Sequence, residues 1–85
     1  MTKKEYKATI YYHIDELHPD YKYIANPKQE LKFKDIYKFP IDYNNDYCIE
    51  IIKEDLKLIA GGGYNYEHIH NIKFEITEVW QNEKK

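Results

Sequence analysis

The fold is decided by residues 5–15, EYKATIYYHID, which alternate between apolar and polar side chains. Successive side chains of a β-strand point to opposite faces, so this pattern predicts a strand with one buried face. Its many β-branched and aromatic residues also favour a strand. We expect the buried face to hold Tyr6, Ala8, Ile10, Tyr12 and Ile14, and the solvent face to hold Lys7, Thr9, Tyr11 and His13.

Two further stretches alternate in the same way. Residues 29–41 separate rings and aliphatic side chains from lysines, although Asp35 falls on the apolar side and predicts a bulge there. A helix beginning near Pro27 is the competing interpretation of this stretch. Residues 68–80 are predicted to form the last strand, with Ile72, Phe74 and Ile76 facing inward.

Three shorter segments complete the predicted sheet. Residues 47–52 and 56–60 indicate two short strands joined by a hairpin loop at 53–55, and residues 21–25 could form another. Five or six short strands predict an all-β, mostly antiparallel fold. We expect a single domain over residues 1–85, a small sandwich or a partly open barrel, with one short helix as an option and a frayed tail at 81–85.

The composition excludes several classes of enzyme. The 85 residues include no Ser and no Arg, and the formal net charge is −2. A Ser-His-Asp hydrolase lacks its nucleophile here, and bidentate guanidinium clamps on phosphate are impossible. No glycine-rich nucleotide-binding motif occurs. We therefore expect a protein that is not an enzyme, has no catalytic residues and needs no cofactor.

The amino-acid composition also indicates where in the cell the protein is located and what kind of genome encodes it. Cys48 is the only cysteine, so no internal disulfide can form. The start of the chain lacks the apolar core of a signal peptide, and no apolar run approaches the ~20 residues that span a bilayer. We expect a cytoplasmic protein without membrane contact. Abundant Ile, Lys, Asn and Tyr suggest AT-rich codons, hence a phage or mobile element of a low-GC bacterium.

Ten tyrosines are too many for so small a core. Exposed Tyr provides rigid, amphipathic contact area, so the excess predicts a protein-binding surface; codon bias is the alternative explanation. The partner we expect is a host factor, such as a defence enzyme, that this protein inhibits or redirects. A homodimer formed through an exposed strand edge is a further possibility. The candidate contact residues are Tyr64, Tyr66, His68 and His70, followed by Tyr21 and Tyr23.

Lysines interleaved with aromatic rings support a different function, binding of single-stranded nucleic acid. In such proteins basic side chains follow the phosphates while rings stack on bases. The negative net charge argues against this alternative. So does ideal strand geometry, which separates lysines from rings onto opposite faces. The candidate residues are Lys22, Lys32, Lys34 and Lys38.

A third alternative is a metal site at His68 and His70, whose side chains would point the same way on a strand. A third ligand would have to come from His13, Asp15 or His18. Two solvent-exposed histidines are the simpler interpretation, and we expect no bound metal.

Two other features suggest chemistry only weakly. Gly61-Gly62-Gly63 could approach a phosphate, but is more typical of a turn. Cys48 has no basic sequence neighbour to activate its thiol, so we expect it to be buried.

Overall fold

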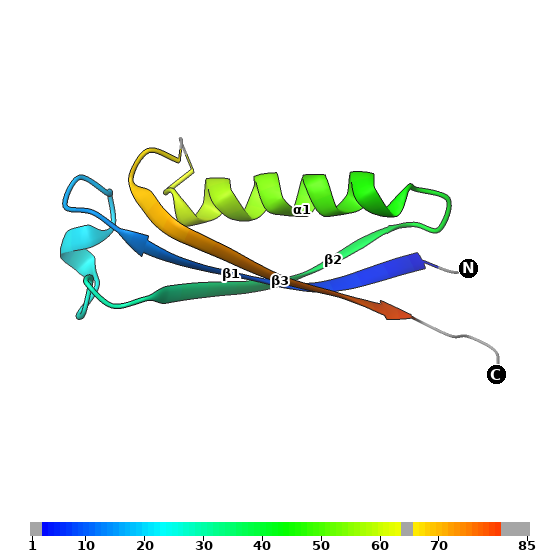
Figure 1. The fold of residues 1–85 in the computed structure, drawn as a ribbon, viewed down its shortest axis with the longest axis horizontal. Coiled ribbons are helices and arrows are strands. Elements are labelled where there is room, and N and C mark those ends of the chain that lie inside the picture. Colours follow the sequence, from blue (N-terminus) through cyan, green and yellow to red (C-terminus); the bar gives the residue numbers. More distant parts are fainter. Residues whose placement is uncertain (1–2, 64–65, 81–85) are drawn as a thin grey trace.

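The computed structural model describes residues 3–63 and 66–80. Along the chain, the described residues form β1 (Lys3–Ile14), a 3-10 turn η1 (Tyr21–Tyr23), β2 (Leu31–Pro40), α1 (Asn45–Ala60) and β3 (Ile69–Trp80) (Figure 1). The predicted predominance of antiparallel strand is confirmed. Within the described residues, however, there are three long strands and one helix, where five or six short strands were expected.

The central strand of the open sheet is β1, because the strand order is β2-β1-β3 and both pairings are antiparallel. Its predicted buried face is confirmed. Tyr6, Ala8 and Ile10 are at most 2% exposed, Ile14 is also buried, and Tyr12 packs half-buried against the core. Lys4 lies on this same face and is also buried, while the residues between these positions alternate onto the opposite face, as the period of two requires.

Most of the stretch 29–41 forms β2 (Leu31–Pro40), so the strand prediction is confirmed and the helix alternative is wrong. Its pairing with β1 runs without a shift from Lys3 opposite Pro40 to Tyr12 opposite Leu31, so the bulge predicted at Asp35 is absent. The register shift lies instead in β3 at Asn71, whose φ of 55° is left-handed. One extra residue there rotates the strand locally and preserves the inward positions of Phe74 and Ile76.

The two short strands predicted at 47–52 and 56–60 are wrong, because residues 45–60 form the single helix α1. Cys48, Ile52, Leu56 and Ala60 recur every fourth residue, which places them on one helical face, and all four are buried. The segment 53–55 is the middle of the helix rather than a hairpin. The described residues include no helix that is long and apolar enough to cross a membrane.

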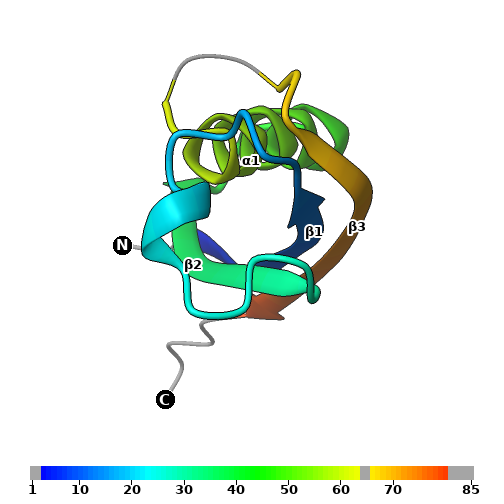
Figure 2. The ribbon, with the colours of Figure 1, turned by 90° about the vertical axis from the view of Figure 1, so that its left-hand side faces the viewer.

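Polar contacts attach both ends of α1 to the rest of the fold. At its start, the Asn44 side chain accepts hydrogen bonds from the backbone of Asp46 and Tyr47, an N-cap. The Asn45 Oδ1 accepts from Lys4 Nζ at 2.6 Å and from the Tyr6 hydroxyl at 3.0 Å. α1 therefore lies along one face of the sheet and carries the chain from the β2 edge to the β3 edge (Figures 1 and 2).

The other end of α1 contacts the long connection between β1 and β2. His18 is buried and its Nε2–H donates to the Ala60 carbonyl at 2.6 Å, while its Nδ1 accepts from the Asp20 backbone at 3.0 Å. These two bonds define a neutral ring with the proton on Nε2. The short strand considered at 21–25 is not formed, since residues 21–23 make the 3-10 turn η1.

Candidate functional site

The face of the sheet opposite α1 is not covered by any described element (Figure 1). Directly opposed residues of antiparallel strands share a face, so the register identifies its members. Glu5 lies opposite Lys38, Lys7 opposite Ile36, Thr9 opposite Lys34 and Tyr11 opposite Lys32. We call this surface the open face. Its exposed lysines include Lys7, Lys32, Lys34 and Lys38, and by the same register Lys3 and Lys73 also lie on this face.

None of the first four of these lysines belongs to an ion pair identified among the described residues, although Glu5 lies directly opposite Lys38 in the register. The lysine ion pairs of the described residues use Lys57, with Glu54, and Lys73, with Glu30. A nearby acid of the open face, Glu75, accepts a hydrogen bond from the Tyr11 hydroxyl at 2.8 Å. The open face therefore concentrates positive charge, although the whole chain has a net charge of −2.

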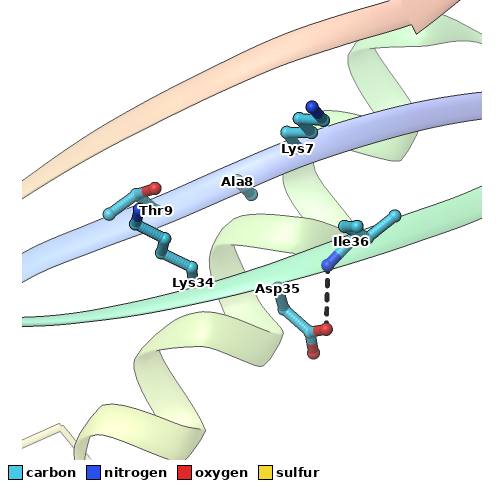
Figure 3. Close-up of a pocket in the computed structure, with 6 residues that line it drawn as sticks. All are labelled: Lys7, Ala8, Thr9, Lys34, Asp35 and Ile36. Carbon is cyan, nitrogen blue, oxygen red and sulfur yellow. Dashed lines mark hydrogen bonds between the residues drawn. The ribbon is translucent and has the colours of Figure 1, made fainter.

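A depression of about 460 Å³ lies between β1 and β2 in the middle of this face (Figure 3). Lys7 and Lys34 contribute two amines to its lining, Thr9 a hydroxyl, and Ile36, which is 53% exposed, an apolar side chain. Asp35 turns its carboxylate toward its own strand, where Oδ1 accepts from the Ile36 backbone at 2.8 Å. An anionic group is the chemical match for such a lining.

The sequence therefore predicted most of this basic cluster. Lys32, Lys34 and Lys38 lie together, and the rings between them face α1, as ideal strand geometry required. Lys22 does not join them: it belongs to η1, where its amine lies 5.3 Å from the centre of the Tyr23 ring. Lys7 was not among the candidates, although the alternation of residues 5–15 already placed it on the solvent face.

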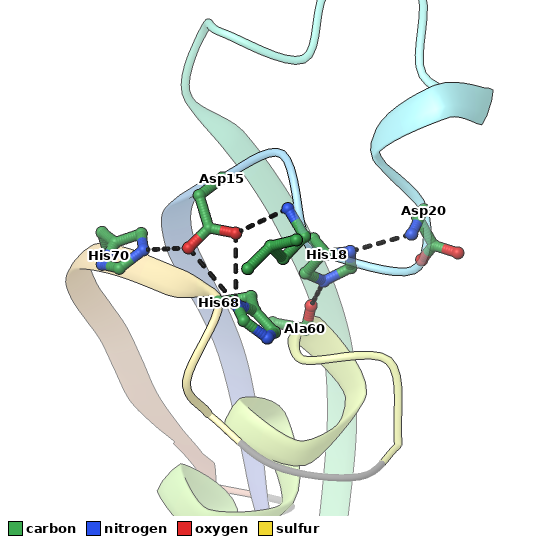
Figure 4. Close-up of polar contacts among 7 residues, drawn as sticks. Asp15, His18, Asp20, Ala60, His68 and His70 are labelled. Atoms are coloured by element: carbon green, nitrogen blue, oxygen red, sulfur yellow. Dashed lines mark hydrogen bonds and ion pairs between the residues drawn. The ribbon is translucent and has the colours of Figure 1, made fainter.

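The histidine candidates lie at one end of the sheet, where β1 ends and β3 begins (Figure 4). The Asp15 carboxylate accepts from His70 Nε2 at 2.8 Å and from His68 Nδ1 at 3.1 Å. Leu17 donates its backbone N–H to the same carboxylate at 2.9 Å. Of the three ligands considered for completing a metal site, only Asp15 contacts both rings; His13 lies opposite His70 in the β1–β3 register, and His18 binds Ala60.

The hydrogen bond from His70, together with the bonds from Leu17 and His68, lowers the pKa of Asp15 to about 2, against a smaller opposing effect of burial. The carboxylate thus remains charged at neutral pH and orients both rings. Among residues 3–63 and 66–80, no group of three or more His, Cys, Asp or Glu side chains is arranged to hold a metal ion. The cluster ties the end of β1 to the start of β3.

The tyrosine candidates are spread over separate contacts. The Tyr66 hydroxyl donates to Glu54 at 2.5 Å and the Lys57 amine lies 4.8 Å from its ring centre, so this ring is held against α1. Tyr21 packs half-buried against the core, whereas Tyr23 is 75% exposed. Tyr64 lies outside the described residues.

An exposed aromatic cluster that the sequence analysis did not single out lies where β2 leads into α1. Ring contacts run outward from the core, from Tyr6 to Phe39 and Tyr43 and on to Tyr47, with centroid separations of 5.8–5.9 Å. Tyr47 is 57% exposed, and Ile41 beside the turn is also exposed. The helical spacing of residues 45–60 was the missed signal, because it turns Tyr47 away from the buried face.

The two weak chemical candidates have structural roles. Cys48 is fully buried in the core face of α1, as expected. Gly61-Gly62-Gly63 forms the turn after α1, and Gly62 and Gly63 have φ values of 86° and 90°. Comparison of the chain with protein-family models, curated proteins and solved structures gives no match.

Proposed function

We propose that this protein is a non-enzymatic nucleic-acid-binding protein and that the open face contacts the phosphate backbone. The observation that carries the proposal is the set of exposed lysines on one face, Lys7, Lys32, Lys34 and Lys38, which outnumber Glu5 and Glu75, the acids that the register places on that face. Lysine is a point-charge ligand for phosphate, and release of counterions from the nucleic acid supplies much of the binding free energy.

The contacts favour recognition of the backbone over recognition of bases. Among the open-face residues paired in the β1–β2 register, the aromatic residue is Tyr11. Its hydroxyl donates a hydrogen bond to the Glu75 carboxylate. The rings that alternate with the lysines, Phe33 and Tyr37, pack toward the core. Base stacking therefore contributes little, so duplex DNA should bind at least as well as a single strand, with low sequence specificity.

The test is the salt dependence of binding to a labelled oligonucleotide, measured by fluorescence anisotropy. Four phosphate contacts predict a slope of about −3 to −4 in log K against log salt for duplex DNA. Lys34→Gln with Lys38→Gln should weaken binding and reduce the magnitude of the slope by about 2. The matched control, Lys22→Gln with Lys28→Gln, removes the same charge from the connection between β1 and β2 and should change binding little.

The proposal fails if the wild-type chain does not bind either oligonucleotide at low salt, or if the two double variants weaken binding equally. The second result would indicate nonspecific attraction to total charge rather than contact with the open face.

A protein partner, such as the host factor that the composition suggested, is the second candidate. The observation that favours it is the exposed pair of rings, Tyr43 and Tyr47, because aromatic side chains are enriched in protein interfaces. A partner retained from a low-GC bacterial lysate after nuclease treatment, at moderate salt and equally by the Lys34→Gln/Lys38→Gln variant, would favour this candidate over nucleic acid.

A further inference from the structure

The two outer edges of the sheet differ in how they are protected against pairing with another strand. On β2, Pro40 has no backbone N–H to offer, and the Ile36 N–H is already bonded to the Asp35 side chain. The lysines of β2 also oppose self-pairing: with two copies antiparallel and centred on Asp35, Lys32 would face Lys38 of the partner subunit. Lysines and proline are common protections of natural sheet edges.

The outer edge of β3 has less of this protection, because its strand contains a single lysine, Lys73. It is the other border of the sheet, and no described element pairs with it (Figure 2). β3 contains no proline, and beyond the register shift near Asn71 its pairing with β1 is regular from Lys73 to Trp80. Ile72, Phe74 and Ile76 are only half-buried, so a strand added to this edge would cover further apolar surface.

We propose that the outer edge of β3 pairs antiparallel with the same edge of a second copy of this chain, about a two-fold axis at Phe74. This inference does not depend on the proposed nucleic-acid binding. In this register, Phe74 lies opposite Phe74 of the partner subunit, and Ile72 lies opposite the partner's Ile76. On the other face, Lys73 lies opposite the partner's Glu75, and by symmetry this pair occurs twice.

Charge complementarity selects this register over its neighbours. A two-fold axis at Lys73 would set two lysines against each other, and an axis at Glu75 would set two glutamates against each other. Like charges directly opposite destabilise a strand pair, whereas opposite charges and apolar pairs stabilise it. An axis between residues 73 and 74, or between 74 and 75, would set Phe74 directly opposite a charged residue, the partner's Lys73 or the partner's Glu75. Opposed residues share a face, so the ring would lie beside that charge.

The contacts that Lys73 and Glu75 make within one copy oppose the new pairing only weakly. The Lys73–Glu30 ion pair spans 3.5 Å between exposed side chains, and such surface pairs contribute little to stability. The Tyr11–Glu75 hydrogen bond is likewise exposed. The dimer would have six strands with both helices on one side, so the lysines of both open faces would point to the other side.

The experiment measures molar mass by size-exclusion chromatography with light scattering over a range of protein concentrations. The wild-type chain should be dimeric at high concentration and dissociate on dilution. Lys73→Glu and Glu75→Lys should each shift the equilibrium to monomer, because each places like charges opposite one another at two positions. The combined variant, Lys73→Glu with Glu75→Lys, restores opposite charges and should recover the dimer.

Two controls separate this interface from effects on folding or on net charge. Lys34→Glu makes the same charge change on β2 and should remain dimeric, and circular dichroism should show every variant folded. A wild-type chain that stays monomeric at every concentration would overturn the proposal. A combined variant that is as monomeric as its folded single variants would overturn the register and its charge pairing.

Discussion

Asp15 is the residue that joins the end of β1 to the start of β3, since both His68 and His70 donate to its carboxylate. These bonds lower the pKa of Asp15 to about 2, below the ordinary value of about 3.9 expected in an unfolded chain. The lower pKa in the folded state means that the ionised carboxylate stabilises the fold. This stabilisation is complete above about pH 4 and is lost as the pH falls toward 2.

Asp15→Asn should therefore lower the thermal unfolding midpoint at pH 7, because the charged acceptor is lost. Between about pH 4 and pH 2 the midpoint of the variant should fall less steeply than that of the wild type, since the linked titration is absent. Thermal unfolding by circular dichroism at several pH values checks this. Asp42→Asn, at an exposed turn position, should keep the wild-type pH dependence; identical profiles for Asp15→Asn and wild type would contradict the prediction.

At the scale of elements, the C-terminal end of α1 depends on a close contact with the connection after β1. A Cβ atom added at Gly62 would lie 2.9 Å from Cγ of Pro19, whereas nothing lies within 4 Å of one added at Gly63. Both glycines have left-handed backbone, with φ of 86° and 90°. The two positions therefore share a backbone preference and differ in packing.

This difference predicts unequal costs for two otherwise similar substitutions. Gly63→Ala should destabilise the fold by about 1 kcal/mol, the cost of left-handed backbone at alanine. Gly62→Ala should cost about 2–3 kcal/mol, because the rigid Pro19 ring must also move. Urea unfolding of both variants measures the two free energies. Equal costs would show that the Pro19 contact does not restrict this turn.

Helix α1 shows why the sequence predicted the wrong kind of secondary structure for residues 47–60. Residues 47–52 and 56–60 are short apolar runs, and short runs do not distinguish a strand from one turn of a buried helix. The available signals for a helix were the capping residue Asn44 and the spacing of four residues between Cys48, Ile52, Leu56 and Ala60. They become decisive only when residues 45–60 are considered as one segment.

At the scale of the whole molecule, the chain is long and thin. Its principal extents are 49 × 21 × 17 Å and its radius of gyration is 15.1 Å, against roughly 12 Å expected for a compact chain of this length. Among the three described strands, only β1 has a paired strand on both sides and a helix across its buried face. The core is consequently concentrated along β1, and the two outer strands are more exposed.

Amide hydrogen exchange should reflect this arrangement. The amides of Tyr6, Ala8 and Ile10 should exchange most slowly, through global unfolding, because these residues are at most 2% exposed in the central strand. Amides of β2 should exchange faster through local opening at the free edge. Exchange followed by NMR measures both sets, and slower exchange in β2 than in β1 would contradict a core centred on β1.

The sequence by itself determined the three long strands in outline, the buried face of β1 and the separation of Lys32, Lys34 and Lys38 from the rings beside them. These features depend on the alternation of apolar and polar residues within a single segment of the chain, so they can be predicted from that segment alone. Tertiary structure alone decided that β1 and β3 are neighbours, so that Asp15 meets His68 and His70, and that Lys7 joins the lysines of β2. It also decided which face α1 covers and which edges remain unpaired. Such contacts join residues far apart in the chain, and the periodicity of one segment contains no information about its neighbour or its register.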